Sequence, residues 1–178
     1  MNLKAKLLGF VAATGLLAGC GLLPGVGGQQ VNGTFVNSQD GTYKWSTVNT
    51  GKVRLALVGV TSQGIIDYSA LAEIKDPKVT QKYVMELPTS AAEGAYRVYA
   101  YCDANADSKF NSGEDIADSG SHILIYSASD RSFAWGSSTI NVKKGWNGYD
   151  TSKASDSTNP YQGENYNGYD LTLRANCQ

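Results

Sequence analysis

The feature that most constrains the fold is a strict alternation of side chains over residues 95–102, AYRVYAYC. One face of this segment would carry Tyr96, Val98 and Ala100, and the other would carry Arg97, Tyr99 and Tyr101. A period of two residues, with many aromatic side chains, is typical of a β-strand. The strand runs directly into a series of acidic and amide side chains that begins at Asp103.

Several other segments have the composition of strands: residues 52–61, 81–87, 122–126, 131–135, 139–143 and 169–175. Residues 52–61, KVRLALVGVT, are almost continuously apolar, as expected for a buried central strand. Residues 66–74 carry a weak helical signal, of one or two turns before Pro77. About seven to nine short strands with turn-rich spacing predict an all-β fold, an antiparallel β-sandwich of the Ig-like or prealbumin-like kind, over residues 31–178.

The segment that follows the strand at residues 95–102 contains six residues with the spacing of ligands in a calcium-binding loop. They are Asp103, Asn105, Asp107, Lys109, Asn111 and Glu114, at loop positions 1, 3, 5, 7, 9 and 12. Calcium binds hard oxygen ligands with modest geometric demands, and Lys109 would contribute its backbone carbonyl. Asp115 is an alternative last ligand, and Phe110 is expected to fix the loop to the core. The alternative is a solvated hairpin loop in which Asn and Asp form turns.

Two departures separate this loop from an EF-hand. Ser108 stands at position 6, where the sharp turn prefers glycine, and a residue with a Cβ is strained there if φ is positive. The sequence before the loop is strand-like, whereas an EF-hand has a helix on each side. We therefore expect an EF-hand-like loop in a β protein, with the weak affinity of extracellular modules, roughly 10⁻⁴–10⁻³ M.

The segment around the loop resembles a known type of module. Residues 93–107, EGAYRVYAYCDANAD, with Pro88 before them and Gly113-Glu114 after them, are similar to the PxGxYxVxAYxDxNxDGxxxxGE pattern of prealbumin-like and Cna-B or SdrD-B-like β-sandwich modules. The resemblance implies structural calcium at Asp103, Asn105, Asp107 and Glu114. It also implies a stalk, adhesion unit or accessory domain of a bacterial surface protein or lipoprotein. Ser108 departs from the usual glycine, and Cys102 is an addition to the pattern.

The N-terminus has the features of a bacterial lipoprotein signal. Lys4 and Lys6 precede an apolar run, LLGFVAATGLLA, that is too short to span a bilayer as a mature helix. Residues 17–20, LAGC, resemble a lipobox, in which lipid is attached to the cysteine and the chain is cut before it. We expect residues 1–19 to be removed, Cys20 to be lipidated and residues 20–30 to form a short tether. A plain secretory signal is the alternative, and it also predicts export.

The predicted processing bears on charge and location. Residues 1–19 hold two of the 15 basic residues and none of the 16 acidic ones, so the formal net charge changes from −1 to −3. Without a basic patch, membrane attachment would depend on acyl chains at Cys20. Gly21 stands where some inner-membrane lipoproteins have Asp, which favours the outer membrane or cell surface. The charge balance argues against a nucleic-acid partner.

The chain has three cysteines, and lipidation of Cys20 would leave Cys102 and Cys177 as an even pair. In an oxidising compartment such a pair is expected to form a disulfide. Closing a loop of this size would stabilise the fold by roughly 4–5 kcal/mol on the chain-entropy estimate. Two buried free thiols are the alternative.

The sequence offers little support for catalysis. His122 is the single histidine, which excludes a metal site built from several imidazoles, and it falls in a predicted strand. No G-x-S-x-G motif occurs. We therefore expect a protein that is not an enzyme, and a hydrolase is the weakest of the functional hypotheses.

Residues 144–167 are polar and aromatic and are predicted to form a long loop. Candidate ligand-binding residues there are Trp146, Tyr149, Tyr161 and Tyr166, whose rings suit stacking on a polysaccharide or a protein partner. The alternative is that these rings cover the end of the sandwich and pack with Trp135 and Trp45.

These observations together favour a lipid-anchored cell-envelope protein. Its calcium-stabilised β-sandwich would be a structural or protein-binding accessory module of a surface assembly, with an envelope protein as partner. A glycan-binding lipoprotein that uses the aromatic loop is the alternative.

Overall fold

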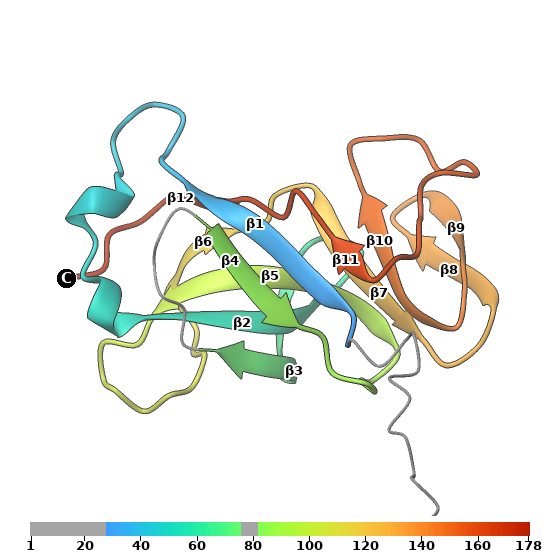
Figure 1. The fold of residues 1–178 in the computed structure, drawn as a ribbon, viewed down its shortest axis with the longest axis horizontal. Coiled ribbons are helices and arrows are strands. Elements are labelled where there is room, and N and C mark those ends of the chain that lie inside the picture. The colour runs from blue at the N-terminus through green and yellow to red at the C-terminus, as the bar shows by residue number, and fades with distance from the viewer. Residues whose placement is uncertain (1–27, 76–81) are drawn as a thin grey trace, which may run out of the picture.

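The computed structural model describes residues 28–75 and 82–178, and the regular secondary structure of these residues is almost entirely β (Figure 1). The strands are β1 (Gln30–Val36), β2 (Val53–Val60), β3 (Ile66–Lys75), β4 (Lys82–Glu86), β5 (Gly94–Cys102), β6 (Asp115–Asp118), β7 (His122–Ser127), β8 (Arg131–Trp135), β9 (Ser138–Val142), β10 (Gly145–Asp150), β11 (Asn165–Tyr166) and β12 (Leu171–Leu173). Two short 3-10 turns, η1 (Trp45–Thr47) and η2 (Thr50–Lys52), are the helical elements of the described residues. The predicted all-β sandwich is confirmed, with more strands than predicted.

The strands form two layers that share β1. The larger layer contains β10, β7, β5, β6 and β12 in that order, with β2 paired to β5 and β3 paired to β2. The smaller layer places β1 between β4 and β11, and it covers β5 and β2 in Figure 1. The far end of β1 pairs with β12, so β1 passes from one layer to the other. β1 runs parallel to both β11 and β12, whereas all the other strand pairs of the described residues are antiparallel, as predicted.

β5 and β2 are buried on both faces. Between the layers, Leu57 and Val98 pack in one apolar cluster with Val31 of β1 and Met85 of β4. The opposite faces of the same strands contribute to a second cluster, which is covered by the hairpin of β8 and β9 and by the loop after β5; its members include Val58, Tyr99, Tyr101, Ile123, Ile125, Ile140, Val142 and Phe110. Burial on both sides explains why residues 52–61 are apolar without alternation.

Two segment predictions were wrong. Residues 66–74 form most of β3, because pairing with the open edge of β2 outweighs a weak helical signal. A bulge shifts the register from Gly59 opposite Asp67 to Val58 opposite Leu71. Residues 144–167 are only partly a loop, since they include β10 and β11.

Gln29 and Gln30, just before the predicted start of the domain at Val31, also make backbone hydrogen bonds to the sandwich. Gln30 starts β1, and its amide donates a hydrogen bond to the carbonyl of Glu164 (2.8 Å). The carbonyl of Gln29 accepts a hydrogen bond from the amide of Leu87 (2.7 Å). The predicted signal, Cys20 and the rest of the tether up to residue 27 lie outside the described residues. Within the described part of the chain, no helix has the length and apolar character needed to cross a membrane.

The predicted disulfide is confirmed. Cys102 and Cys177 are bonded, with their Cα atoms 5.4 Å apart, and the bond ties the end of β5 to the C-terminus across 75 residues of sequence. The C-terminus is also held to η2. The amide of Asn49 donates to the carbonyl of Cys177 (2.8 Å), and Lys52 Nζ donates to Gln178 O (2.8 Å).

Candidate metal loop

Residues 103–114 form a loop whose two ends are fixed. They join β5 to β6, at the end of the sandwich that also holds the C-terminus (Figure 1). The amide of Cys102 donates to the carbonyl of Glu114 (2.8 Å), which closes the base of the loop. The amide of Asp103 donates to the carbonyl of Lys52 (2.8 Å), which ties the first residue of the loop to η2. The loop thus starts from a rigid base beside the disulfide.

The loop turns sharply at two non-glycine residues. Ala106 and Ser108 both have φ of 58°, in the left-handed region that favours glycine. Ser108 is the residue that stands where calcium loops usually have glycine. The loop therefore adopts the left-handed backbone with a Cβ present, at a cost of about 1–2 kcal/mol for each such residue.

Asp103 is the most buried acid of the loop, with 3 % of its surface exposed. Its Oδ2 accepts hydrogen bonds from Arg54 Nε (2.5 Å) and from the amide of Ser108 (3.2 Å). Its Oδ1 is buried and has no hydrogen-bond partner. Because Ser108 lies across the turn, the carboxylate is inside the loop. A buried carboxylate oxygen without a partner is rare and costly.

The remaining predicted ligand residues are connected to one another. Asn111 Nδ2 donates to Asp107 Oδ2 (3.2 Å) and to Glu114 Oε2 (3.2 Å). Asn105 Nδ2 donates to the same Asp107 oxygen (3.1 Å). The amide of Lys109 donates to Asp107 Oδ1 (2.8 Å), and this bond lowers the pKa of Asp107. The structure thus brings the predicted residues into one network.

Asp115 does not take part in this network. Its carboxylate pairs with Arg174, which also pairs with Asp118. Arg174 lies over the ring of Tyr99, 5.9 Å from its centroid. Glu114 is therefore the closing carboxylate of the loop, and Asp115 serves the contact between β6 and the end of β12.

Phe110 fixes the loop to the core, as predicted. Its ring is buried and lies 5.5 Å from the ring of Tyr99, 5.2 Å from that of Tyr101 and 5.3 Å from that of Tyr68. The hydroxyl of Tyr101 is a second buried polar group without a partner. Burial raises the pKa of Tyr101 to about 12; Arg54 opposes this shift, while nearby acids of the loop add to it.

The acids of the loop are not gathered around one point. Within the described part of the chain, no group of three or more His, Cys, Asp or Glu side chains is placed to hold a metal ion. Hydrogen-bond donors lie beside the loop carboxylates instead: Arg54 Nε at Asp103, and the Asn111 amide between Asp107 and Glu114. The donor set still fits calcium chemically, because it offers carboxylate and amide oxygens and one unpartnered buried oxygen.

The aromatic residues of the second candidate site are mostly buried. Trp146, Tyr149 and Tyr166 belong to the core. Trp146 Nε1 donates to the carbonyl of Pro88 (2.8 Å), and the Tyr166 hydroxyl donates to the carbonyl of Trp146 (2.7 Å). These three rings therefore do not form an exposed stacking surface. Trp146 and Tyr149 lie on β10, which pairs with β7, and Tyr166 lies on β11, which pairs with β1.

Trp146 and Tyr166 share one core cluster with Trp45, and Trp135 packs against the cluster that contains Tyr149, in line with the alternative prediction. Trp146 packs edge-on against Tyr96 (5.2 Å) and Tyr126 (5.1 Å). Trp45, which was a predicted partner, packs against Phe35 (4.8 Å).

Tyr161 is the half-buried member of the set. It lies against Gly148, where an added Cβ would be 2.6 Å from Tyr161 Cζ. It lines a hollow of about 530 Å³ together with Asn147, Asp156 and Gln162. The side chain of Asn147 is fully engaged with backbone groups, including the amide of Lys143 (2.9 Å).

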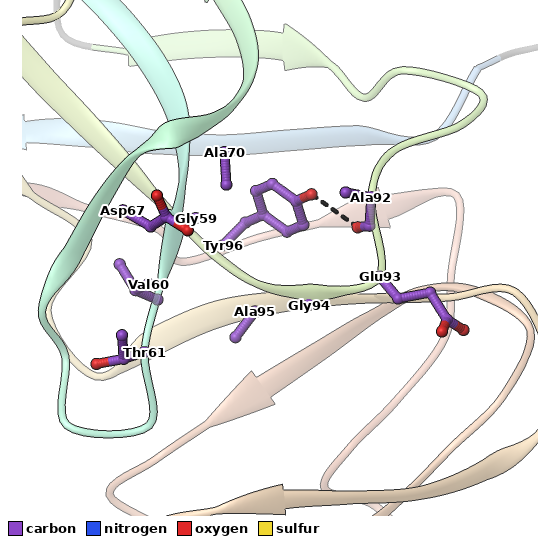
Figure 2. Close-up of a pocket in the computed structure, with 10 residues that line it drawn as sticks. All are labelled: Gly59, Val60, Thr61, Asp67, Ala70, Ala92, Glu93, Gly94, Ala95 and Tyr96. Carbon is purple, nitrogen blue, oxygen red and sulfur yellow. Dashed lines mark hydrogen bonds between the residues drawn. The ribbon is translucent and has the colours of Figure 1, made fainter.

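A smaller cavity, of about 210 Å³, lies at the other end of β5 (Figure 2). Tyr96 points across it and donates a hydrogen bond to the carbonyl of Ala92 (2.7 Å). Glu93 points away from Tyr96 and pairs with Arg131 (3.3 Å). Asp67 is engaged by the hydroxyl of Ser69 (2.6 Å). Sequence patterns do not indicate this cavity, because its lining comes from β2, β3 and β5, which only strand pairing brings together.

The single histidine has a structural setting. His122 Nε2 is 3.7 Å from Asp150 Oδ2, and its ring lies 5.4 Å from that of Tyr169. Ser152 Oγ donates to the other oxygen of Asp150 (2.6 Å). The serine and the imidazole therefore both contact the carboxylate, whereas a nucleophilic triad needs the serine on the imidazole. Burial alone would raise the pKa of Asp150, but the hydrogen bonds from Ser152 outweigh this effect, and the pKa is lowered.

Comparison of the chain with protein-family models, curated proteins and solved structures found no match. The fold defines an all-β sandwich protein, and the likeness to prealbumin-like modules is one of local sequence pattern.

Proposed function

We propose that this protein is a lipid-anchored protein of the bacterial cell envelope whose β-sandwich is stabilised by calcium. It would serve as a structural or protein-binding accessory module of a surface assembly, and the proposal includes no catalytic activity. The observation that carries it is the buried Asp103 Oδ1, which has no partner inside a loop rich in oxygen ligands.

Calcium suits this loop better than other common metals. Zinc and the transition metals favour imidazole and thiolate ligands, whereas the loop offers carboxylates, side-chain amides and a backbone carbonyl. The residues that would hold the ion are Asp103, Asn105, Asp107 and Glu114, with Asn111 and the carbonyl of Lys109. Rotation of an Asn side chain replaces its NH₂ donor by its carbonyl oxygen. When bound, calcium would supply the positive charge that the loop acids share.

The position of the loop favours a structural role for the ion. One end of the loop adjoins the disulfide, and the backbone of Asp103 bonds to η2, which also holds the C-terminus. An ion bound there would connect segments that are far apart in the sequence. A weak site is sufficient outside the cytoplasm, because extracellular modules have dissociation constants of roughly 10⁻⁴–10⁻³ M.

The arrangement of the chain supports presentation of this end to a partner. Figure 1 places the loop and the C-terminus at one end of the sandwich, and the start of β1 lies away from them, beside β11. If Cys20 carries lipid, the end with the loop would be the one farther from the membrane. A protein partner in the envelope would then approach the end that calcium stabilises.

Lipidation of Cys20 and calcium-dependent binding of a partner are tested separately. Intact-mass measurement of the protein purified from membranes should show acyl chains on Cys20 and none in Cys20→Ser, which should be released from the membrane. Pull-down of the lipidated protein from envelope extract should recover a protein partner in calcium and lose it in chelator. A Cys20→Ser protein that stays membrane-bound, or a recovery unaffected by chelator, would contradict the corresponding part.

A further inference from the structure

Arg54 is placed by the sheet beside the first residue of the metal loop. β2 pairs antiparallel with β5 so that Arg54 lies opposite Tyr101, and paired residues project from the same face of a sheet. Its Nε is 2.5 Å from Asp103 Oδ2. The side chains are 25 % and 2 % exposed, respectively, so the ion pair is largely withdrawn from water.

We propose that Arg54 is a built-in cation that compensates the charge of Asp103 when no metal is bound, and that it sets how weakly the loop binds a divalent cation. The inference rests on the proposed calcium site and names the residue that regulates it.

Two electrostatic effects act in the same direction. A buried carboxylate that loses its partner is strongly destabilised, so removal of Arg54 would raise the free energy of the metal-free loop. A cation at Asp103 would also be repelled by the guanidinium, and this repulsion is strong at short range away from water. Both effects make the loop without Arg54 bind a divalent cation more tightly.

One effect acts in the opposite direction. Arg54 holds Asp103 Oδ2 and thereby leaves Oδ1 as the available ligand atom, and loss of such an orienting contact weakens metal sites. The amide of Ser108 binds the same Oδ2 (3.2 Å) and remains in place when Arg54 is substituted. Two groups therefore orient the Asp103 carboxylate, and one of them remains without Arg54. The electrostatic effects on calcium affinity should then outweigh the loss of the Arg54 contact.

The consequence is a loop that stays folded without calcium and binds it weakly. Arg54 and the donors on Asn105 and Asn111 already neutralise or bond the loop acids. A loop without such an arginine would be strained when empty and would bind calcium more tightly.

The experiment compares the full chain with Arg54→Met and Arg54→Gln. Met keeps an unbranched apolar side chain and removes the charge, while Gln keeps a hydrogen-bond donor for Asp103. Arg131→Met is the matched control, because Arg131 pairs with Glu93 (3.3 Å). Terbium is titrated and detected by energy transfer from tyrosine, with Tyr101 next to the loop, and calcium affinity is obtained by competition.

Both Arg54 variants should have a lower melting temperature in chelator and bind calcium at least about tenfold more tightly than the wild type. Arg131→Met should bind within about twofold of the wild type, because that ion pair is exposed. If the Arg54 variants bind calcium and the wild type shows no measurable binding, the result also supports the inference.

Two results would overturn the inference, and they distinguish a failure of the role of Arg54 from a failure of the calcium site. If the wild type binds calcium and both Arg54 variants bind it equally or more weakly, Arg54 does not set the affinity, while the calcium site stands. If neither the wild type nor any variant binds terbium or calcium at millimolar concentration, the proposed calcium site fails and the role of Arg54 fails with it. Should Arg54→Met not fold, Arg54→Gln gives the same comparison.

Discussion

The amide of Cys102 donates a hydrogen bond to the carbonyl of Glu114, at 2.8 Å, so the first and last residues around the candidate metal loop are held together. Cys102 is at the same time bonded to Cys177. The loop geometry, the disulfide and the C-terminus are therefore mechanically connected, and changes at one are expected to affect the others.

Calcium should stabilise the wild-type protein, and Asp103→Asn should abolish the effect. Free calcium at tenfold its dissociation constant stabilises by roughly 1.4 kcal/mol, which corresponds to a rise in melting temperature of about 3–6 °C for a domain of this size. The measurement is thermal unfolding in calcium and in chelator. Asp130→Asn is the control, because Asp130 is exposed and pairs with Lys143. A calcium shift that persists in Asp103→Asn would contradict the assignment.

Loss of the disulfide should destabilise the domain substantially. A loop of 75 residues corresponds to about 4.5 kcal/mol on the chain-entropy estimate. Denaturant unfolding of the double variant Cys102→Ser with Cys177→Ser measures this loss, and non-reducing peptide mapping verifies the bond in the wild type. A difference below about 1 kcal/mol would show that the bond contributes little. The double variant should also bind calcium more weakly, because Cys102 adjoins the loop.

Gly33 in β1 should not tolerate a side chain. A Cβ at this position would lie 2.5 Å from the carbonyl carbon of Tyr169, which is backbone and cannot rotate away. Gly33→Ala should therefore destabilise the domain by about 1–3 kcal/mol, as overpacking does elsewhere. Gly51→Ala is the control, since its Cβ would be 3.4 Å from the nearest atom, Asn49 Oδ1. Equal stability of the two variants in urea would be inconsistent with this contact.

Buried tyrosines should make the fold sensitive to alkali. Burial raises the pKa of Tyr101 and of Tyr166 to about 12, whereas an exposed tyrosine titrates near about 10. A raised pKa gives stability that is fully present below pH 10 and is lost as the pH rises to about 12. Denaturant unfolding from pH 8 to 12, with tyrosinate absorbance recorded in parallel, should show this loss.

The two tyrosines should differ when the hydroxyl is removed. Tyr101→Phe should be close to neutral at pH 8, because that hydroxyl has no partner. Tyr166→Phe should cost about 1 kcal/mol, because its hydroxyl donates to Trp146 and accepts from Gln29 (3.0 Å). A constant stability from pH 9 to 12, or a larger loss at Tyr101 than at Tyr166, would argue against this account.

The predictable parts of the fold are those with a local signal. Residues 95–102 form β5, as their alternating pattern predicts. Residues 52–61 contain β2, as their continuous apolar character predicts for a buried strand. The spacing of the loop marked Ser108 as the residue that would be strained at positive φ, and its φ is 58°. β3 was missed because its conformation depends on pairing with β2, which no local pattern specifies.

The unpredictable parts of the site depend on distant contacts. Arg54 is 49 residues from Asp103 in the sequence, and only the register of β2 on β5 brings them together. Trp146 looks like a surface residue in a polar segment, yet pairing of β10 with β7 places it in the core. Composition describes a segment, but burial is decided by its partners in space.

The parallel pairing of β1 has a consequence for the order of folding. β1 is the first strand of the domain, yet its neighbours include β11 and β12, near the last residues of the chain. A chain that emerges N-terminus first, from a ribosome or an export channel, releases β1 long before these partners exist. One edge of β1 can pair with β4 early, but the pairings with β11 and β12 must wait until residues 165–172 have been made or exported, and a chain shortened before β11 would leave those pairings unmade.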